Sequence, residues 1–470
     1  MRKTKIVCTI GPASDSPEVL EKMCLAGMNV ARLNFSHGTH EEHRARIEQI
    51  RRVREKLGLP IAIMLDTKGP EYRLGVFENK TVYLQDGEEF TFTARDIVGN
   101  REMVSVTYKN LPHELQPGDT ILVNNGLSEF RVKAIRDLDI LTEVIHGGEL
   151  KSRKSMSFPG KVFRQPYLSE QDKADLLLGI EEDVDFIACS FVSEKQNLLD
   201  VQAFLNEHGA RGIELIAKIE NQSGFDHIGE ISTACDGIMV ARGDMGVEVP
   251  LERLPAMQKH IITQCRMLGK RVITATEMLE SMTHNPRPTR AETSDVANAV
   301  YDGTSAVMLS AETAAGEFPV ESVSMMARIC EETEKHIPYE EHFRQATFHI
   351  RNLEDAISHA TCMMAVDIKA SCIVACTLSG VTARMVSRFR GPVDIIGLTV
   401  DKKTWRKLTL SWGVRPCLTE QYPSTDVLFY SAKKAAAEVM GLGSGDRIVI
   451  TGGVTNGQSG NTDLIKVEVI

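Results

Sequence analysis

The chain has 470 residues, of which 42% are hydrophobic and 25% are charged. This composition is ordinary for a globular protein and argues against a disordered, collagen-like or coiled-coil chain, while the length predicts two to four domains. The formal net charge of −10 makes general DNA or RNA binding a poor expectation. Local positive groups must therefore hold any anionic ligand.

The lack of a recognisable targeting signal and the scattered cysteines favour a cytoplasmic protein. The basic start of the chain precedes only a short apolar run before Gly11 and Pro12, too short for the core of a signal peptide. No stretch approaches the roughly 18 uninterrupted apolar residues of a membrane-spanning helix. The 10 cysteines are scattered singly, without a CxxC pair, which is typical of reduced thiols. We expect no membrane partner.

Short apolar, β-branched runs alternate with amphipathic helical stretches along most of the chain. Eight such runs end, in chain order, at Gly11, Ser36, Thr67, Phe191, Glu220, Asp244, Glu277 and Glu312. Eight strands alternating with helices predict an α/β fold, the parallel (β/α)8 or TIM barrel. In such a barrel the carboxyl ends of all strands meet at one mouth.

The alternation is interrupted once, over residues 70–167. Short alternating segments there are divided by turn signals such as Gln85-Asp86-Gly87, which predicts an inserted small all-β domain. Its insertion at the barrel mouth suits a lid. The barrel is then discontinuous and comprises residues 1–69 and 168–340.

Beyond residue 345 the pattern changes to an open-sheet α/β domain that extends to residue 470. The expected strands cover 372–377, 394–399, 447–451 and 464–469, and the expected helices cover 353–369, 382–390, a stretch from 402, and 424–440. Residues 338–348 are interpreted as a linker.

Polar side chains are concentrated at the carboxyl ends of the barrel strands. They are Arg32, Asn34, Ser36, Asp66, Lys218, Glu220, Asp244, Thr276 and Glu312. A charge at the end of a buried strand is costly unless it is paired or used. A structural salt bridge explains any one of them, but so many at one mouth favour a reaction site.

One group suits a divalent cation. Lys218 and Glu220 are two residues apart, so in a strand they share a face. Glu220 and Asp244, from neighbouring strands, offer hard carboxylate oxygens for Mg²⁺, which water and substrate oxygens complete. The alternative is a structural Lys–Glu pair.

A second group suits a monovalent cation beside phosphate. Asn34, Ser36, Asp66 and Thr67 offer uncharged oxygens and one carboxylate, the ligand set expected for K⁺. Arg32 and Arg73 are guanidinium forks that suit phosphate. Taken singly, Asn34 and Ser36 also fit turn positions, and His37 fits a helix cap.

A third motif lies in the C-terminal domain. Thr377-Leu378-Ser379-Gly380-Val381-Thr382 links a strand to a helix, and exposed backbone N–H groups in such a loop bind phosphate. A plain capping loop is an equal alternative. We expect that the Gly-rich segment 452–461 can fold over this loop.

These motifs occur in an order and at a spacing that together identify a family. From KTKIVCTIGP through RLNFSHG, DTKGPE, IAKIEN, MVARGDMGVE and NPRPTRAE, the sequence resembles pyruvate kinase along its whole length. The likeness is to a bacterial form without an extra C-terminal phosphoenolpyruvate-utilising domain. It implies phosphoryl transfer from phosphoenolpyruvate to ADP, giving pyruvate and ATP in the last step of glycolysis, with Mg²⁺ (or Mn²⁺) and K⁺.

The resemblance also implies residue roles. Lys218, Thr276 and Arg32 would be catalytic, and these three would bind the substrate together with Gly243 and Asp244. Nucleotide contacts fall on Asn34, His37, Arg73 and Lys154. Glu220 and Asp244 would hold Mg²⁺, and Asn34, Ser36, Asp66 and Thr67 would hold K⁺. A phosphorylated sugar or nucleotide effector would contact Thr377, Ser379, Gly380 and Thr382. The resemblance further implies that the protein forms a homotetramer.

Some residues depart from the family pattern. Asn124 and Asn125 replace two lid aspartates, Ala315 replaces a lysine, and Glu277 replaces a glutamine. These changes predict altered nucleotide handling. One alternative is therefore a weakly active or regulatory pyruvate kinase paralogue, and another is a barrel enzyme that performs aldol or carboxyl chemistry on pyruvate enolate.

Overall fold

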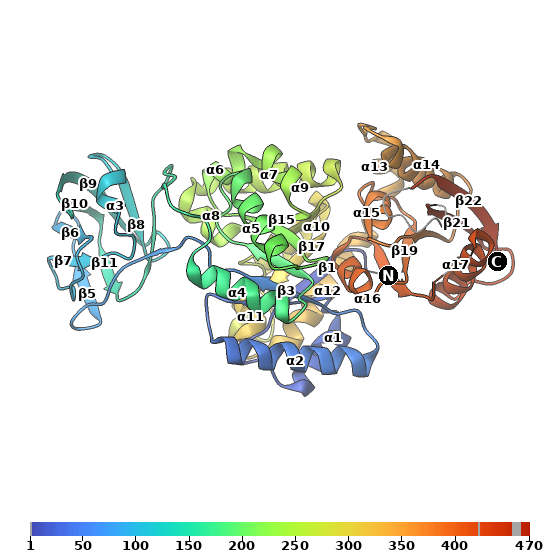
Figure 1. Cartoon of the computed structure of the whole chain (residues 1–470), viewed down its shortest axis with the longest axis horizontal. Helices are drawn as coiled ribbons and strands as arrows, with labels where there is room; N and C mark the ends of the chain where they lie inside the picture. The colour runs from blue at the N-terminus through green and yellow to red at the C-terminus, as the bar shows by residue number, and fades with distance from the viewer. Residues whose placement is uncertain (1, 422–423, 454–461) are drawn as a thin grey trace.

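The computed structural model describes residues 2–421, 424–453 and 462–470, and it has three parts in a row (Figure 1). The central part is a closed barrel of parallel strands in the order β1-β17-β16-β15-β14-β13-β3-β2. The strands are β1 (Lys5–Thr9), β2 (Val30–Asn34), β3 (Ala62–Asp66), β13 (Phe186–Cys189), β14 (Glu214–Ile219), β15 (Gly237–Ala241), β16 (Arg271–Ala275) and β17 (Ala306–Leu309). The barrel prediction is confirmed, because each of the eight expected runs supplies one strand.

Helices cover the outside of the barrel. They are α1 (Pro17–Ala26), α2 (His40–Leu57), α4 (Glu170–Glu181), α5 (Lys195–Glu207), α6 (Gln222–Asp226), α7 (Ile228–Ala234), α8 (Arg242–Glu248), α9 (Leu254–Leu268), α10 (Arg290–Asp302), α11 (Ala311–Ala314) and α12 (Pro319–Lys335). Short 3-10 turns at Leu251–Arg253 and Glu280–Thr283 complete the rim. Nearly every strand residue is buried, because the helices cover one sheet face and the barrel interior covers the other.

The segment between β3 and α4 forms a separate β domain at one end of the barrel (Figure 1). Its strands are β4 (Tyr72–Arg73), β5 (Thr81–Leu84), β6 (Glu89–Thr93), β7 (Met103–Ser105), β8 (Thr120–Val123), β9 (Ser128–Arg136), β10 (Asp139–His146), β11 (Gly148–Lys151) and β12 (Ser155–Ser157), with the short helix α3 (Leu111–Glu114). Phe90, Phe92 and Phe130 pack together in its own core. We call this domain the lid.

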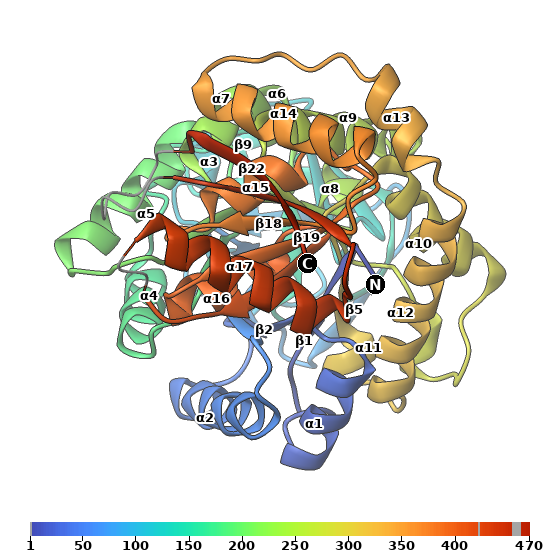
Figure 2. The ribbon, with the colours of Figure 1, turned by 90° about the vertical axis from the view of Figure 1, so that its right-hand side faces the viewer.

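The third part is an open sheet in the order β20-β19-β18-β21-β22. Its strands are β18 (Cys372–Cys376), β19 (Asp394–Thr399), β20 (Val414–Leu418), β21 (Arg447–Gly452) and β22 (Leu464–Val469). Its helices are α14 (Leu353–Asp367), α15 (Val381–Ser387), α16 (Lys402–Lys407) and α17 (Thr425–Met440). Helices α14 and α15 pack on one face of the sheet and α17 on the other (Figure 2).

The sequence analysis missed two elements in this region. Strand β20 was not expected, because its five residues include Pro416 and follow a 3-10 turn, Leu408–Leu410, without a clear break. Residues 338–348, predicted as a linker, contain helix α13 (Tyr339–Gln345). The same 3-10 turn also joins two parts of the molecule, since Leu410 is buried among the interior residues of the barrel. Most of segment 452–461 lies outside the described residues.

Candidate active site

Lys218 lies at the centre of the barrel mouth, near the end of β14. Its Nζ lies 2.7 Å from Ser190 Oγ, 3.0 Å from Asp66 Oδ1 and 3.0 Å from Glu220 Oε1. The side chains come together because β3, β13 and β14 are neighbours in the barrel. Burial would lower the pKa of Lys218, but Asp66 and Glu220 raise it overall, so the ammonium stays charged.

Arg32 supplies a second positive charge, from β2. Its Nε donates to Asp66 Oδ2 at 2.6 Å, and its Nη1 donates to Thr9 Oγ1 at 2.8 Å. Burial would raise the pKa of Asp66, but Arg32 and Lys218 hold it below its usual value. Asp66 therefore bridges the two cations, and both cations keep donors for a further anion.

Glu220 has the free oxygen that a metal site needs. Oε2 accepts a hydrogen bond from the backbone N–H of Phe191. Oε1 is buried and accepts no hydrogen bond within the described residues, although the Lys218 ammonium lies 3.0 Å away. Burial has the largest effect on the pKa of Glu220 and, together with Asp244, raises it to about 7 although Lys218 opposes both. A divalent cation would relieve this unfavourable negative pair.

The chemistry of these donors fits Mg²⁺. Asp244 is exposed at the start of α8, where it lines the pocket and its charge raises the pKa of Glu220. Within the described residues no group of three or more His, Cys, Asp and Glu side chains converges as a metal site. Two carboxylates with water and substrate oxygens form the coordination shell that Mg²⁺ commonly takes.

The four residues expected to bind K⁺ lie at the ends of β2 and β3. Asn34 is opposite Asp66 in the strand register. Asn34 Oδ1 accepts from the Ser36 N–H at 3.1 Å, and Thr67 Oγ1 accepts from the Ser190 N–H at 3.2 Å. Both carboxylate oxygens of Asp66 already contact Arg32 or Lys218. The group is thus gathered on neighbouring strands, with oxygens partly engaged in local hydrogen bonds.

Thr276 and Gly243 meet at the mouth beside β16. Thr276 has a left-handed backbone, with φ of 67°, and its Oγ1 accepts from the Gly243 N–H at 2.8 Å. Arg242 Nη2 donates to the Thr276 carbonyl at 2.6 Å, and its Nη1 contacts both carboxylate oxygens of Asp295. The sequence analysis missed Arg242, although the polar end of the β15 segment marks its position.

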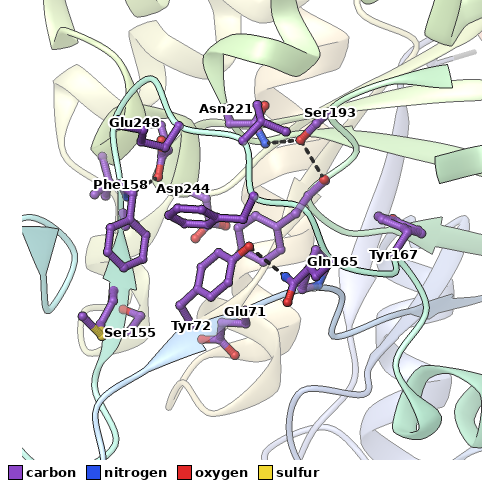
Figure 3. Close-up of a pocket in the computed structure, with 18 of the residues that line it drawn as sticks. Glu71, Tyr72, Ser155, Phe158, Gln165, Tyr167, Ser193, Asn221, Asp244 and Glu248 are labelled. Carbon is purple, nitrogen blue, oxygen red and sulfur yellow. Dashed lines mark hydrogen bonds between the residues drawn. The ribbon is translucent and has the colours of Figure 1, made fainter. Parts of the chain in front are cut away.

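A pocket lies between the lid and the barrel mouth (Figure 3). Tyr72 and Phe158 line it from the lid side, and Asp244 and Glu248 line it from the barrel side. Glu248 accepts from the Phe158 N–H at 3.3 Å, so the two parts touch directly. Burial raises the pKa of Glu248 to about 7.

The residues expected to contact the nucleotide, Asn34, His37, Arg73 and Lys154, are not among those that line this pocket, although Arg73 and Lys154 are chain neighbours of the lining residues Tyr72 and Ser155. Arg73 Nη2 lies 2.7 Å from Glu71 Oε1, and Arg73 Nη1 donates to the Arg153 carbonyl. Lys154 is half-buried on the lid beside β12. His37 is exposed after β2, and its carbonyl lies 2.9 Å from His43 Nε2.

The backbone conformation of the lid explains why asparagines occupy positions 124 and 125. Asn124 and Asn125 have φ of 56° and 57°, and Gly126 follows with φ of 78°. Asparagine is one of the few residues with a side chain that adopts the left-handed region readily. Asn125 also lines the pocket, where Ser155 Oγ donates to its Oδ1 at 3.2 Å.

Glu312, Glu277 and Ala315 differ in their surroundings. Glu312 is fully buried and accepts from the Leu279 and Ser310 N–H groups, so it braces two loops. Glu277 is exposed with φ of 54°, and it contributes to raising the pKa of Glu280 after the larger effect of burial. Ala315 follows helix α11.

The C-terminal loop at residues 377–382 is held by hydrogen bonds within it and to neighbouring segments. The Gly380 N–H donates to Thr377 Oγ1 at 2.9 Å, and Thr382 Oγ1 lies 2.8 Å from Thr462 Oγ1. Thr404 Oγ1 from α16 donates to the Leu378 carbonyl at 2.8 Å. Ser379 is half-buried at the tip. The loop lies far from the barrel mouth, in the third part of the molecule (Figure 1).

Fold and site together define a barrel protein whose mouth gathers the buried cations Arg32 and Lys218 with carboxylates, a charge arrangement that suits an anionic substrate. Comparison with known proteins specifies it further. The family model of the pyruvate kinase barrel domain matches residues 1–323, and that of the pyruvate kinase alpha/beta domain matches residues 355–468. The chain belongs to the pyruvate kinase family, and it is a phosphotransferase of that activity.

Individual relatives agree over the full length. The chain is 44% identical to a pyruvate kinase of Clostridium acetobutylicum, with 100% of both chains covered. It is 47% identical to a pyruvate kinase of Staphylococcus saprophyticus, covering 100% of this chain and 81% of that protein. A solved pyruvate kinase from Cryptosporidium parvum superposes with a TM-score of 0.94 at 36% identity, covering 100% of this chain and 96% of that one. Among the described helices, none has the length and apolarity needed to cross a bilayer.

Proposed function

We propose that the cluster around Lys218 transfers the phosphoryl group of phosphoenolpyruvate to ADP, giving pyruvate and ATP. The observation that carries this assignment is the buried ammonium between Asp66 and Glu220, beside a Glu220 oxygen that accepts no hydrogen bond in the part of the chain that the structure describes. Phosphoryl transfer needs positioning and charge neutralisation more than a protein nucleophile. Lys218 and Arg32 would neutralise the negative charge on the oxygens of the phosphoryl group during its transfer.

The remaining roles follow the same chemistry. Gly243 and Asp244, at the start of α8, would bind the substrate carboxylate, and Thr276 would help to protonate the enolate. Glu220 and Asp244 would hold Mg²⁺ (or Mn²⁺), which supplies charge stabilisation between substrate oxygens when bound. Arg73 and Lys154 on the lid, with Asn34 and His37 on the barrel, would bind the nucleotide.

Four further assignments rest on the family relationship. Asn34, Ser36, Asp66 and Thr67 would hold K⁺ beside the phosphate groups. A phosphorylated sugar or nucleotide would regulate the enzyme at the loop that contains Thr377, Ser379, Gly380 and Thr382. The protein would act as a homotetramer in the cytoplasm. The weakly active paralogue lacks support, because the charge cluster is complete and the unusual lid asparagines fit their backbone conformation.

The direct test is the variant Lys218→Met, which removes the ammonium and keeps an unbranched side chain. Loss of a preorganised charge at the reacting group typically costs about 10²–10³-fold in turnover. We expect at least that loss of ATP formation in a coupled assay with Mg²⁺ and K⁺. Lys259→Met is the matched control, since Lys259 is exposed and pairs with Asp302 on the barrel exterior. Turnover of Lys218→Met within a few-fold of the wild type would refute the assignment.

A further inference from the structure

Both chain segments that connect the barrel to the lid pass against one residue, Ser190, which follows β13. On the outgoing segment, Gly69 has φ of 67°, and a Cβ there would lie 2.8 Å from the Ser190 carbonyl oxygen. On the returning segment, the Tyr167 hydroxyl donates to that same carbonyl at 2.6 Å. Tyr167 is 7% exposed, so this bond is shielded from water. The two connections of the lid therefore converge on one peptide group.

The side chain of Ser190 points to the ammonium of Lys218. Lys218 Nζ donates to Ser190 Oγ at 2.7 Å, and Ser190 Oγ lies 2.6 Å from the Thr67 carbonyl that it donates to. The Ser190 N–H donates to Thr67 Oγ1. Ser190 is 1% exposed, and it is the neutral member of the three groups around this ammonium. Its position therefore helps to set the position of Lys218.

The next residue extends the connection to Glu220. Phe191 has a left-handed backbone, with φ of 55°, and its N–H donates to Glu220 Oε2. A bulky residue such as phenylalanine is strained in this region. The Tyr167 hydrogen bond stabilises the peptide that leads into the strained residue. One turn, Ser190–Phe191, thus contacts both the ammonium and the proposed metal ligand.

We propose that Tyr167 and Ser190 are positioning residues that connect the base of the lid to Lys218 and Glu220. Tyr167 fixes the Ser190–Phe191 turn, Ser190 Oγ orients the ammonium, and the Phe191 N–H orients the carboxylate. Neither Tyr167 nor Ser190 is assigned a contact with the reacting atoms. The inference rests on the proposed role of Lys218 and adds that lid attachment and charge placement share one turn.

The variant Tyr167→Phe tests this inference by removing a single oxygen atom. Loss of one buried hydrogen bond corresponds to about a fivefold to tenfold change in an equilibrium. We expect turnover to fall by that factor, and the Mg²⁺ concentration for half-maximal activity to rise by a similar factor. Tyr339→Phe is the matched control, because the Tyr339 hydroxyl is buried and makes no hydrogen bond within the described residues. Its turnover and Mg²⁺ requirement are expected to match the wild type.

Ser190→Ala completes a double-mutant cycle, measured as turnover at saturating substrates. If Tyr167 acts through Ser190, Tyr167→Phe has a smaller effect in the Ser190→Ala background than in the wild type. A purely structural role would lower the thermal unfolding temperature and leave turnover and Mg²⁺ requirement unchanged, which would overturn the inference. Independent, additive effects of the two substitutions would also overturn it. An active Lys218→Met enzyme would instead refute the proposed function itself.

Discussion

Lys218 carries a buried positive charge that its neighbours stabilise. Its ammonium is held by Asp66, Glu220 and Ser190, and Arg32 lies on the other side of Asp66. Taking an unpaired ammonium out of water would be costly, but these partners replace the lost hydration. The cluster contains the carboxylates of Asp66 and Glu220 with Asp244 nearby, so it retains a negative excess that a divalent cation can balance.

Glu71 leads to a residue-scale prediction about K⁺. Its carboxylate lies 2.7 Å from Arg73, and Glu71 lines the pocket and follows the proposed K⁺ ligand Thr67 by 4 residues in the chain. A glutamate adds a negative charge that a bound cation can balance, whereas a lysine at this position would supply the positive charge itself. We expect turnover to fall about tenfold or more when Na⁺ replaces K⁺, a loss of roughly 1.4 kcal/mol of transition-state stabilisation.

Glu71→Lys is expected to reduce that dependence, and Glu71→Gln, which adds no cation, is expected to keep it. The measurement is steady-state turnover in matched Na⁺ and K⁺ buffers. Equal wild-type rates in both buffers would contradict the K⁺ assignment.

At the scale of the element, helix α2 fixes the loop that carries His37. Thr39 caps this helix: its side chain accepts from the Glu42 N–H, and Glu42 accepts from the Thr39 N–H, which completes a capping box. Each cap satisfies a backbone donor that the first helical turn leaves free. The loop after β2 is thereby held on both sides, by the barrel strand and by the helix.

Thr39→Ala is expected to lower the free energy of unfolding by about 1 kcal/mol, because it removes the cap acceptor. Urea unfolding followed by far-UV circular dichroism measures this change. Thr233→Ala, at an exposed hydroxyl near the end of α7, serves as the comparison and should change stability by less than about 0.5 kcal/mol. Equal stability of the two variants would show that the cap is not needed.

For the whole molecule, a charge network joins the barrel to the C-terminal domain. Glu214 at the start of β14 forms salt bridges with Arg271 in the barrel and with Lys407 in α16, the latter at 3.2 Å. Burial would raise the pKa of Glu214, but Arg271, Arg384 and Lys407 lower it to about 2. Because Leu410 is inserted into the barrel interior nearby, the C-terminal domain is held by both apolar and ionic contacts.

Glu214→Gln is expected to destabilise the protein by about 3–5 kcal/mol at neutral pH, since it leaves buried cations without their partner. The pKa of Glu214 is lower in the folded than in the unfolded chain, so its contribution is complete above about pH 4.5 and is lost as the pH falls toward 2. The difference between the urea midpoints of wild type and variant should therefore be the same at pH 7 and pH 5 and smaller at pH 3. Glu21→Gln, at the half-buried partner of the exposed Lys56, should change stability by about 0–1 kcal/mol. A pH-independent difference for Glu214→Gln would contradict this account.

The sequence by itself determined the barrel, the lid insertion and the polar residues at the strand ends. These features are local: strand periodicity, turn residues and the polar end of each apolar run are visible in short windows, and the motifs from RLNFSHG to NPRPTRAE identified the family. Strand β20 was not predicted, because Pro416 lies within it and tertiary packing rather than local strand propensity makes this segment a strand.

Only the tertiary structure decided which polar groups meet. No local pattern distinguishes Ser190 at a strand end, Tyr167 in the lid connection or Arg242 within a motif. In the structure Tyr167 contacts Ser190 at 2.6 Å and Ser190 contacts Lys218 at 2.7 Å. Arg242 contacts Thr276 at 2.6 Å. Tyr167 and Ser190 are 23 residues apart in the chain, and Ser190 and Lys218 are 28 apart. Such contacts depend on barrel closure and on the path of two lid connections, because hydrogen bonds need an exact distance and direction that no local pattern specifies.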